Sequence, residues 1–130
     1  MAAGKRSAGA AAGRQKGEAL QITKSMLKAY KKTKRVIPLM QAELNEIKAG
    51  RVEKLVKERE RRLRENREKV EAMDQWIDAI EDDETRLVFD LYYRKGRTWK
   101  QIAAKLGAAY SEDYVRKLYR DKYLSEKGIS

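Results

Sequence analysis

The spacing of apolar and polar positions predicts an all-helical chain. Over residues 18–48, apolar side chains recur at helical spacing on either side of the only proline, Pro38. They are Leu20, Leu27, Tyr30 and Ile37, then Met40, Leu44 and Ile47. Proline disfavours helix at the residue before it and is accepted in a first turn. We therefore expect two shorter helices that meet at Pro38, or one helix with a kink, and a break at Gly50.

Residues 51–80 carry the most regular pattern, in which apolar positions alternate by four and three residues as in a heptad repeat. The positions are Val52, Val56, Arg59, Leu63, Asn66, Val70, Met73, Ile77 and Ile80. A helix of about 30 residues would be about 45 Å long and could not bury this stripe alone. It must pack on residues 18–48 as a hairpin, on a second copy of the chain, or on both.

We take six of these positions as candidate oligomerisation residues: Val56, Leu63, Asn66, Val70, Met73 and Ile77. Asn66 either fixes the register or oligomeric state, or is a tolerated polar residue near an exposed end. The neighbouring arginine run, residues 59–67, resembles a nucleic-acid patch, but glutamates are interleaved with it. A salt-bridged solvent face is therefore the better interpretation.

Residues 81–124 carry the signals of three short helices. The acidic run of residues 81–84 suits a helix start, and a first helix is expected over about 84–94. Its inner side is predicted to hold Leu87, Val88, Leu91 and Tyr92. Gly96 fits a left-handed cap at its end. Thr98 with Gln101 then forms a capping box for a second helix, whose apolar face holds Trp99, Ile102, Ala103 and Leu106.

Gly107 is expected to end the second helix, and Ser111 to cap the third. The third helix has an apolar side and a basic side. The apolar side holds Val115, Leu118, Tyr119 and Tyr123. Three short helices with a glycine turn before the last are typical of a helix-turn-helix. We therefore divide the chain into a disordered basic tail (1–17), a helical oligomerisation or partner-docking region (18–80) and a DNA-binding domain (81–130).

A capped helix with basic residues on its exposed face suits the major groove of double-stranded DNA. The candidate base contacts are Tyr114, Arg116, Lys117 and Arg120, and the candidate contacts to the DNA backbone are Thr98, Lys100 and Lys105. A three-helix bundle without a ligand, whose charges are simply solvated, is the alternative.

The net charge of +11 favours a polyanionic partner. In the tail, Lys5, Arg6, Arg14 and Lys16 are either accessory phosphate contacts or solubilising charges. The chain has no cysteine and no histidine, which removes disulfides, thiol catalysis and the usual zinc sites. We find no catalytic constellation, so we expect neither an enzyme nor a cofactor or metal. No apolar run is long enough to cross a membrane.

The segments T-W-K-Q-I-A-A-K-L-G and S-E-D-Y-V-R-K-L-Y-R resemble region four of sigma factors and the C-terminal helix-turn-helix of small phage and prophage regulators. That group includes the ArpU- and RinA-like late-gene activators. The match covers residues 80–124, and the turn 107–111 is longer than the tight turn usual in sigma region four. The resemblance implies promoter or operator binding in a bacterial host cytoplasm, with Tyr114, Arg116, Lys117 and Arg120 in recognition positions. No segment resembles the part of a sigma factor that melts the promoter.

These observations favour a sequence-specific transcription regulator, acting as a homo-oligomer, with a dimer favoured. The heptad helices would dimerise the chain or dock on a partner such as RNA polymerase. The alternative is a small terminase subunit that recognises phage DNA for packaging, which would form a ring of many subunits. A recombinase fragment lacks support in the residues, and a coiled-coil adaptor would leave the C-terminal motif superfluous.

Overall fold

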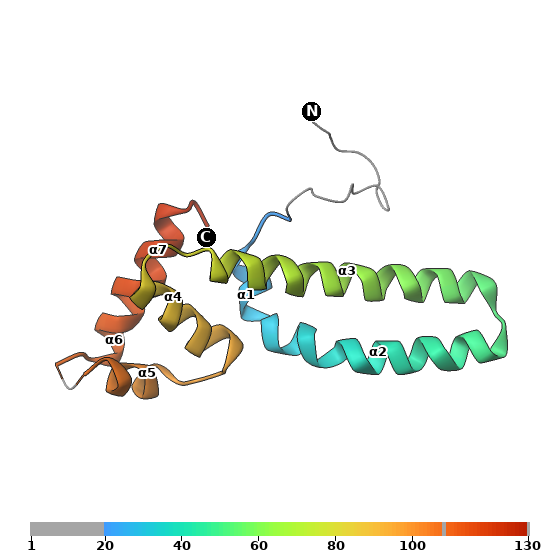
Figure 1. The fold of residues 1–130 in the computed structure, drawn as a ribbon, viewed down its shortest axis with the longest axis horizontal. Coiled ribbons are helices and arrows are strands. Elements are labelled where there is room, and N and C mark those ends of the chain that lie inside the picture. Colours follow the sequence, from blue (N-terminus) through green and yellow to red (C-terminus); the bar gives the residue numbers. More distant parts are fainter. Residues whose placement is uncertain (1–19, 108, 130) are drawn as a thin grey trace, which may run out of the picture.

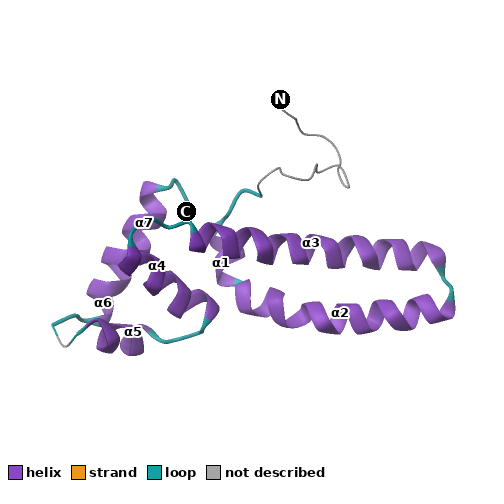
Figure 2. Cartoon of the chain, in the orientation of Figure 1, coloured by secondary structure: helices purple, strands orange, loops and turns teal. Residues whose placement is uncertain are grey.

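The computed structural model describes residues 20–107 and 109–129, and every regular element within these ranges is a helix. Two long antiparallel helices, α2 and α3, form an arm, and the shorter helices α4 to α7 gather beside the base of that arm (Figures 1 and 2). The tail prediction, with Lys5, Arg6, Arg14 and Lys16, lies outside the described residues.

The first helical segment is interrupted at Ala29 and not at Pro38. Helix α1 spans Lys24–Lys28 and begins at Thr23, whose side chain accepts a hydrogen bond from the Met26 amide. Helix α2 spans Tyr30–Gly50 and contains Pro38 in its interior. Of the two predicted alternatives, that of two helices meeting at Pro38 is wrong, and a single helix passes through Pro38. Pro38 is exposed, so water can hydrogen-bond the carbonyl that loses its helical donor there.

The heptad stripe packs within one chain, as the hairpin interpretation expects. Helix α2 ends at Gly50 as predicted, although the left-handed residue of the turn is Arg51, with φ 60°. Helix α3 spans Glu53–Asp78 and returns antiparallel to α2. Four stripe residues are buried along α3: Leu63, Val70, Met73 and Ile77. Val56 is half-buried, and Val52, at the tip, is half-exposed.

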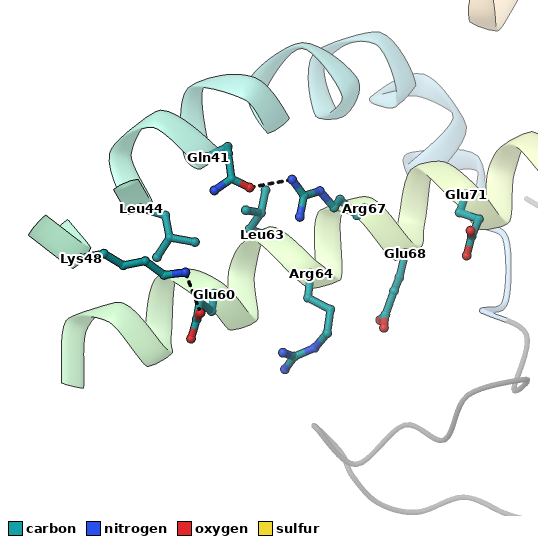
Figure 3. Close-up of a pocket in the computed structure, with 9 residues that line it drawn as sticks. All are labelled: Gln41, Leu44, Lys48, Glu60, Leu63, Arg64, Arg67, Glu68 and Glu71. Carbon is teal, nitrogen blue, oxygen red and sulfur yellow. Dashed lines mark hydrogen bonds and ion pairs between the residues drawn. The ribbon is translucent and has the colours of Figure 1, made fainter. Parts of the chain in front are cut away.

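Polar pairs also join the two helices of the arm, and two of them involve stripe positions. Asn66 Nδ2 donates to Met40 Sδ at 3.0 Å, and Arg59 Nε pairs with Glu43 Oε1 at 3.3 Å. Figure 3 shows two further links across a shallow groove of the arm: Arg67 to Gln41 at 2.7 Å and Lys48 to Glu60 at 3.3 Å.

Within α3 itself, Arg61 pairs with Glu65 at 2.9 Å, and Arg62 with Glu58 at 3.7 Å. The interpretation of the arginine run as salt-bridged is therefore confirmed for Arg59, Arg61 and Arg62.

The C-terminal unit, residues 83–126, consists of three helical stretches. The first joins α4 (Asp83–Phe89) to the π-helical segment η1 (Asp90–Arg94). The second is α5 (Trp99–Leu106). The third joins α6 (Glu112–Val115), the π-helical segment η2 (Arg116–Asp121) and α7 (Lys122–Glu126). The third stretch is therefore longer than the short helix that the sequence suggested.

Two hydrophobic cores hold these parts together. The first lies where the base of the arm meets the C-terminal unit. Its buried members are Ile22, Leu27, Tyr30, Val70, Met73, Ile77, Ile80, Phe89, Tyr93 and Leu124. The second lies inside the C-terminal unit and comprises Val88, Leu91, Ile102, Ala103, Val115 and Tyr119. Because the first core draws on both regions, packing is continuous across the boundary expected at residue 80.

Candidate nucleic-acid interface

Side-chain caps fix where the three stretches of the C-terminal unit begin. Asp82 accepts hydrogen bonds from the amide and the hydroxyl of Thr85, at 3.0 and 2.8 Å, which lower the pKa of the Asp82 carboxyl. Thr98 and Gln101 form the predicted capping box, with reciprocal bonds of 3.1 and 2.9 Å. Ser111 Oγ accepts from the Tyr114 amide at 3.1 Å. The acidic run of residues 81–84 therefore serves a helix start, as predicted.

Glycines turn the chain between the capped helices. Gly96 has φ 69° and Gly107 has φ 134°, both in the region that side chains with a Cβ rarely adopt. Between the two turns, α5 packs on the 112–126 helix through Ile102, Ala103 and Val115, which are all buried. The small side chain of Ala103 permits this close approach. The predicted apolar face of α5 is thus the face that is covered.

Most of the predicted DNA contacts are exposed. Thr98, Lys100 and Lys105 are exposed on α5. On the 112–126 helix, Lys117 is exposed and Tyr114 is 50% exposed. The ring of Tyr114 stacks on that of Tyr110 at 5.5 Å between centroids, which holds an aromatic pair at the start of this helix.

Arg116 is partly exposed and forms an ion pair. Its Nη2 is 2.9 Å from Asp113 Oδ1, one turn earlier on the same helix. The Asp113 side chain is 72% exposed. Exposed pairs of this kind contribute only about 0–1 kcal/mol, so a stronger partner can displace Asp113 from the guanidinium.

Arg120 is not on the exposed face, and that part of the prediction is wrong. Its side chain is only 17% exposed, and its guanidinium lies over the rings of Trp99 and Tyr92, at 5.1 and 5.6 Å from their centroids. It also donates to Asp121 at 2.9 Å. The long side chain of Arg120 turns toward the rings of Tyr92 and Trp99, which lie on other helices, and this tertiary contact accounts for the difference.

The inner side of the first stretch also differs from the prediction. Leu87, predicted to face inward, is 44% exposed. Val88 and Leu91 are buried as expected, but Phe89 and Tyr93, which the pattern did not single out, are buried as well. In the aromatic run F-D-L-Y-Y, consecutive apolar residues point into both cores, so no single helical face describes them.

A network around Arg94, also missed from the sequence, anchors the C-terminal unit on the arm. The Arg94 guanidinium donates to Asp90 at 2.6 Å, to Asp78 at 2.7 Å and to Asp74 at 3.1 Å. Its hydrogen bond holds the pKa of the Asp78 carboxyl below the usual value. Asp74 also accepts from the Tyr30 hydroxyl at 2.7 Å, so α2, α3 and η1 meet there. In the sequence, the spacing of Asp74, Asp78 and Asp90 was the signal that could have indicated this network.

No protein family, curated protein or solved structure matches this chain. Within residues 20–107 and 109–129, no group of acidic side chains is arranged to hold a metal ion. None of the helices in these ranges combines the length and apolar character needed to span a lipid bilayer.

Proposed function

We propose that this chain is a DNA-binding transcription regulator of the phage or prophage kind that the resemblance implies, with a helix-turn-helix formed by α5 and the 112–126 helix. The observation that carries the proposal is the asymmetry of this pair. Its inner face is closed by Ile102, Ala103 and Val115, while Lys117 and Tyr114 stand exposed near the start of the second helix. The start of such a helix is the part that meets base edges in the major groove.

In this proposal the contacts divide by chemistry. Lys117 and Arg116 donate to base acceptors in the groove, Arg116 after exchanging Asp113 for a base. Tyr114 contacts a base or the sugar beside it. Thr98, Lys100 and Lys105 position the domain on the phosphates, which fixes its register without reading sequence. Arg120 supports the domain from within and does not contact DNA.

The arm is proposed to be a rigid lever for assembly or partner docking. Leu63, Val70, Met73 and Ile77 are already covered within one chain, so they contact a second copy only if the hairpin opens. A dimer therefore pairs through other surfaces or through an exchange of arms. RNA polymerase is the partner that the resemblance suggests for the outer faces of the arm.

Selection from a pool of randomised duplexes tests the proposal, with the wild type compared with Arg116→Ala and Lys117→Ala. We expect a short motif that each variant reads less strictly, with a loss of about 1–3 kcal/mol in specific binding for a lost base contact. Lys57→Ala, an exposed cation on α3, is the control and should leave the motif unchanged. A motif that both recognition variants leave intact would contradict the proposal. Binding without a motif, by a ring of many subunits, would favour the packaging alternative.

A further inference from the structure

The excess positive charge of residues 24–80 lies in α1 and the first part of α2, and not on the returning helix α3. Residues 43–80 contain ten basic and ten acidic side chains and are neutral overall. Residues 24–42 contain six basic side chains and no acidic one: Lys24, Lys28, Lys31, Lys32, Lys34 and Arg35. Solubility alone does not explain this segregation, because residues 43–80 are also highly charged but carry basic and acidic side chains in equal numbers.

The two segments also differ in how their cations are used. In residues 43–80, four of the ten basic side chains pair with a glutamate: Lys48, Arg59, Arg61 and Arg62. None of the six cations in residues 24–42 has a carboxylate partner among the residues that the structure describes. Lys34 lies over the ring of Tyr30 at 5.8 Å, which leaves its charge uncompensated.

The base of the arm lies against the loop that leads into α5. The side chain of Lys31 packs on Gly96, where an added Cβ would collide with Lys31 Nζ and lie 3.2 Å from its Cδ. The adjacent Arg97 is exposed, and its guanidinium has only the carbonyl of Lys95, at 3.5 Å, as a partner among the described residues. Lys34 and Arg35 follow Lys31 at three and four residues, on the same side of α2.

From this juxtaposition we propose that Lys31, Lys34, Arg35 and Arg97, the basal patch, bind the phosphate backbone of duplex DNA outside the groove that the 112–126 helix enters. The inference rests on the proposed function and extends it, because the base of the arm becomes part of the DNA-binding surface. Uncompensated cations that adjoin the start of α5 would follow the backbone past the recognition site. Such contacts add affinity and salt dependence but no sequence preference.

The test compares two charge-matched triple variants of the full chain. Lys31→Gln/Arg35→Gln/Arg97→Gln removes three charges from the basal patch. Lys54→Gln/Lys57→Gln/Arg64→Gln removes three exposed charges from the distal part of α3. Affinity for the selected duplex and for a scrambled duplex of equal length is measured over a range of salt concentrations. Melting curves establish that both variants remain folded.

We expect the basal variant to reduce the slope of log affinity against log salt by about 2.7, or about 0.9 per lost phosphate contact. The loss should be the same for both duplexes, and the distal variant should shift the slope much less. Equal salt slopes for the two variants would overturn the proposal that the basal patch binds DNA, even if Lys117→Ala still relaxes the motif. Conversely, a reduced basal slope with no effect of Lys117→Ala would retain the patch and contradict the proposed reading helix.

Anionic vesicles of phosphatidylserine and phosphatidylcholine serve as a second probe. If the basal variant lost vesicle binding but kept the wild-type salt slope on DNA, the patch would be a membrane-surface site and the inference would be wrong. We expect the basal variant to lose DNA affinity whether or not vesicles bind.

Discussion

The guanidinium of Arg120 joins parts of the C-terminal unit that local hydrogen bonds do not connect. The rings of Tyr92 and Trp99 are stacked at 4.1 Å, and Arg120 lies over both of them. These three residues come from η1, α5 and η2. An arginine suits this place because its planar guanidinium stacks on aromatic rings and stays charged when partly buried.

Replacement of Arg120 by alanine should therefore lower the free energy of unfolding. We expect a loss of about 1–2 kcal/mol, from the cation–π contact and the packing of the side-chain stem. Urea unfolding followed by circular dichroism measures it. Arg120→Lys should restore only part of the loss, since an ammonium keeps the charge without the planar stack. Wild-type stability in Arg120→Ala, with a relaxed DNA motif instead, would return Arg120 to the group of base contacts.

Tyrosines make the stability of the fold sensitive to alkaline pH. Burial, with a hydrogen bond to Glu84, raises the pKa of Tyr119 to about 12, and burial raises the pKa of Tyr93 to about 12 as well. Burial shifts the pKa of Tyr30 and of Tyr123 in the same direction. Since the ordinary pKa is 10.0, the unfolded chain loses these protons at a lower pH than the folded chain.

The stabilisation that these tyrosines provide is complete below about pH 10 and is lost as the pH rises through about 12. We expect the urea midpoint to fall over this interval. In Tyr93→Phe/Tyr119→Phe the fall should be shallower, because two of the shifted groups are gone. An exposed tyrosine, Tyr114, provides the control, and Tyr114→Phe should keep the wild-type pH profile. Parallel profiles for wild type and the double variant would show that other groups govern alkaline unfolding.

At the scale of the elements, the features that could be predicted are those set by neighbouring residues. The capping box of Thr98 with Gln101 and the cap at Ser111 were predictable because a cap involves residues three apart. Gly96 was predictable because its left-handed φ excludes most other residues. The heptad stripe predicted a long helix with a buried face, although not whether that face pairs within or between chains.

The errors have physical causes of longer range. Pro38 interrupts a hydrogen bond but not α2, because the packing of Tyr30 and Leu44 on either side of it holds the helix together. The inward turn of Arg120 depends on the rings of Tyr92 and Trp99, which come from other helices, so the spacing within the third helix could not predict it. The basal patch could not be predicted from the sequence, because it is formed by a tertiary contact between Lys31 and Gly96, which are 65 positions apart.

Leu63 tests the hairpin as an element. It is 2% exposed between α2 and α3, so Leu63→Asp would bury an unpaired carboxylate. We expect a loss of at least about 3 kcal/mol in the free energy of unfolding. Arg64→Asp, at the adjacent exposed position, should cost far less. Light scattering coupled to gel filtration gives the mass in the same samples. A lower mass for Leu63→Asp with unchanged melting would instead assign the stripe to an interface between chains.

At the scale of the whole molecule, the arm and the C-terminal unit share a core, so they should unfold together. Met73 of α3 is 1% exposed in the same core as Phe89, Tyr93 and Leu124. Trp76 touches this core, where its ring meets those of Phe89 and Tyr123 at 5.7 Å each. The Arg94 ion pairs reinforce the junction. In the proposed function, this junction would transmit the position of the arm to the DNA without a flexible linker.

The two tryptophans allow this coupling to be measured. Trp76 reports on the junction and Trp99 on the second core, so Trp99→Phe and Trp76→Phe each leave one fluorescent reporter. We expect both reporters to give the same urea midpoint. Met73→Ala should lower both midpoints equally, because a cavity at the junction destabilises everything that unfolds with it. The corresponding loss in the free energy of unfolding should be about 2–5 kcal/mol. Lys69→Ala, at an exposed position on α3, should move neither midpoint. If Met73→Ala shifted only the midpoint reported by Trp76, the C-terminal unit would be independently stable. The arm would then be a separable attachment and not a lever fixed to the proposed DNA-binding surface.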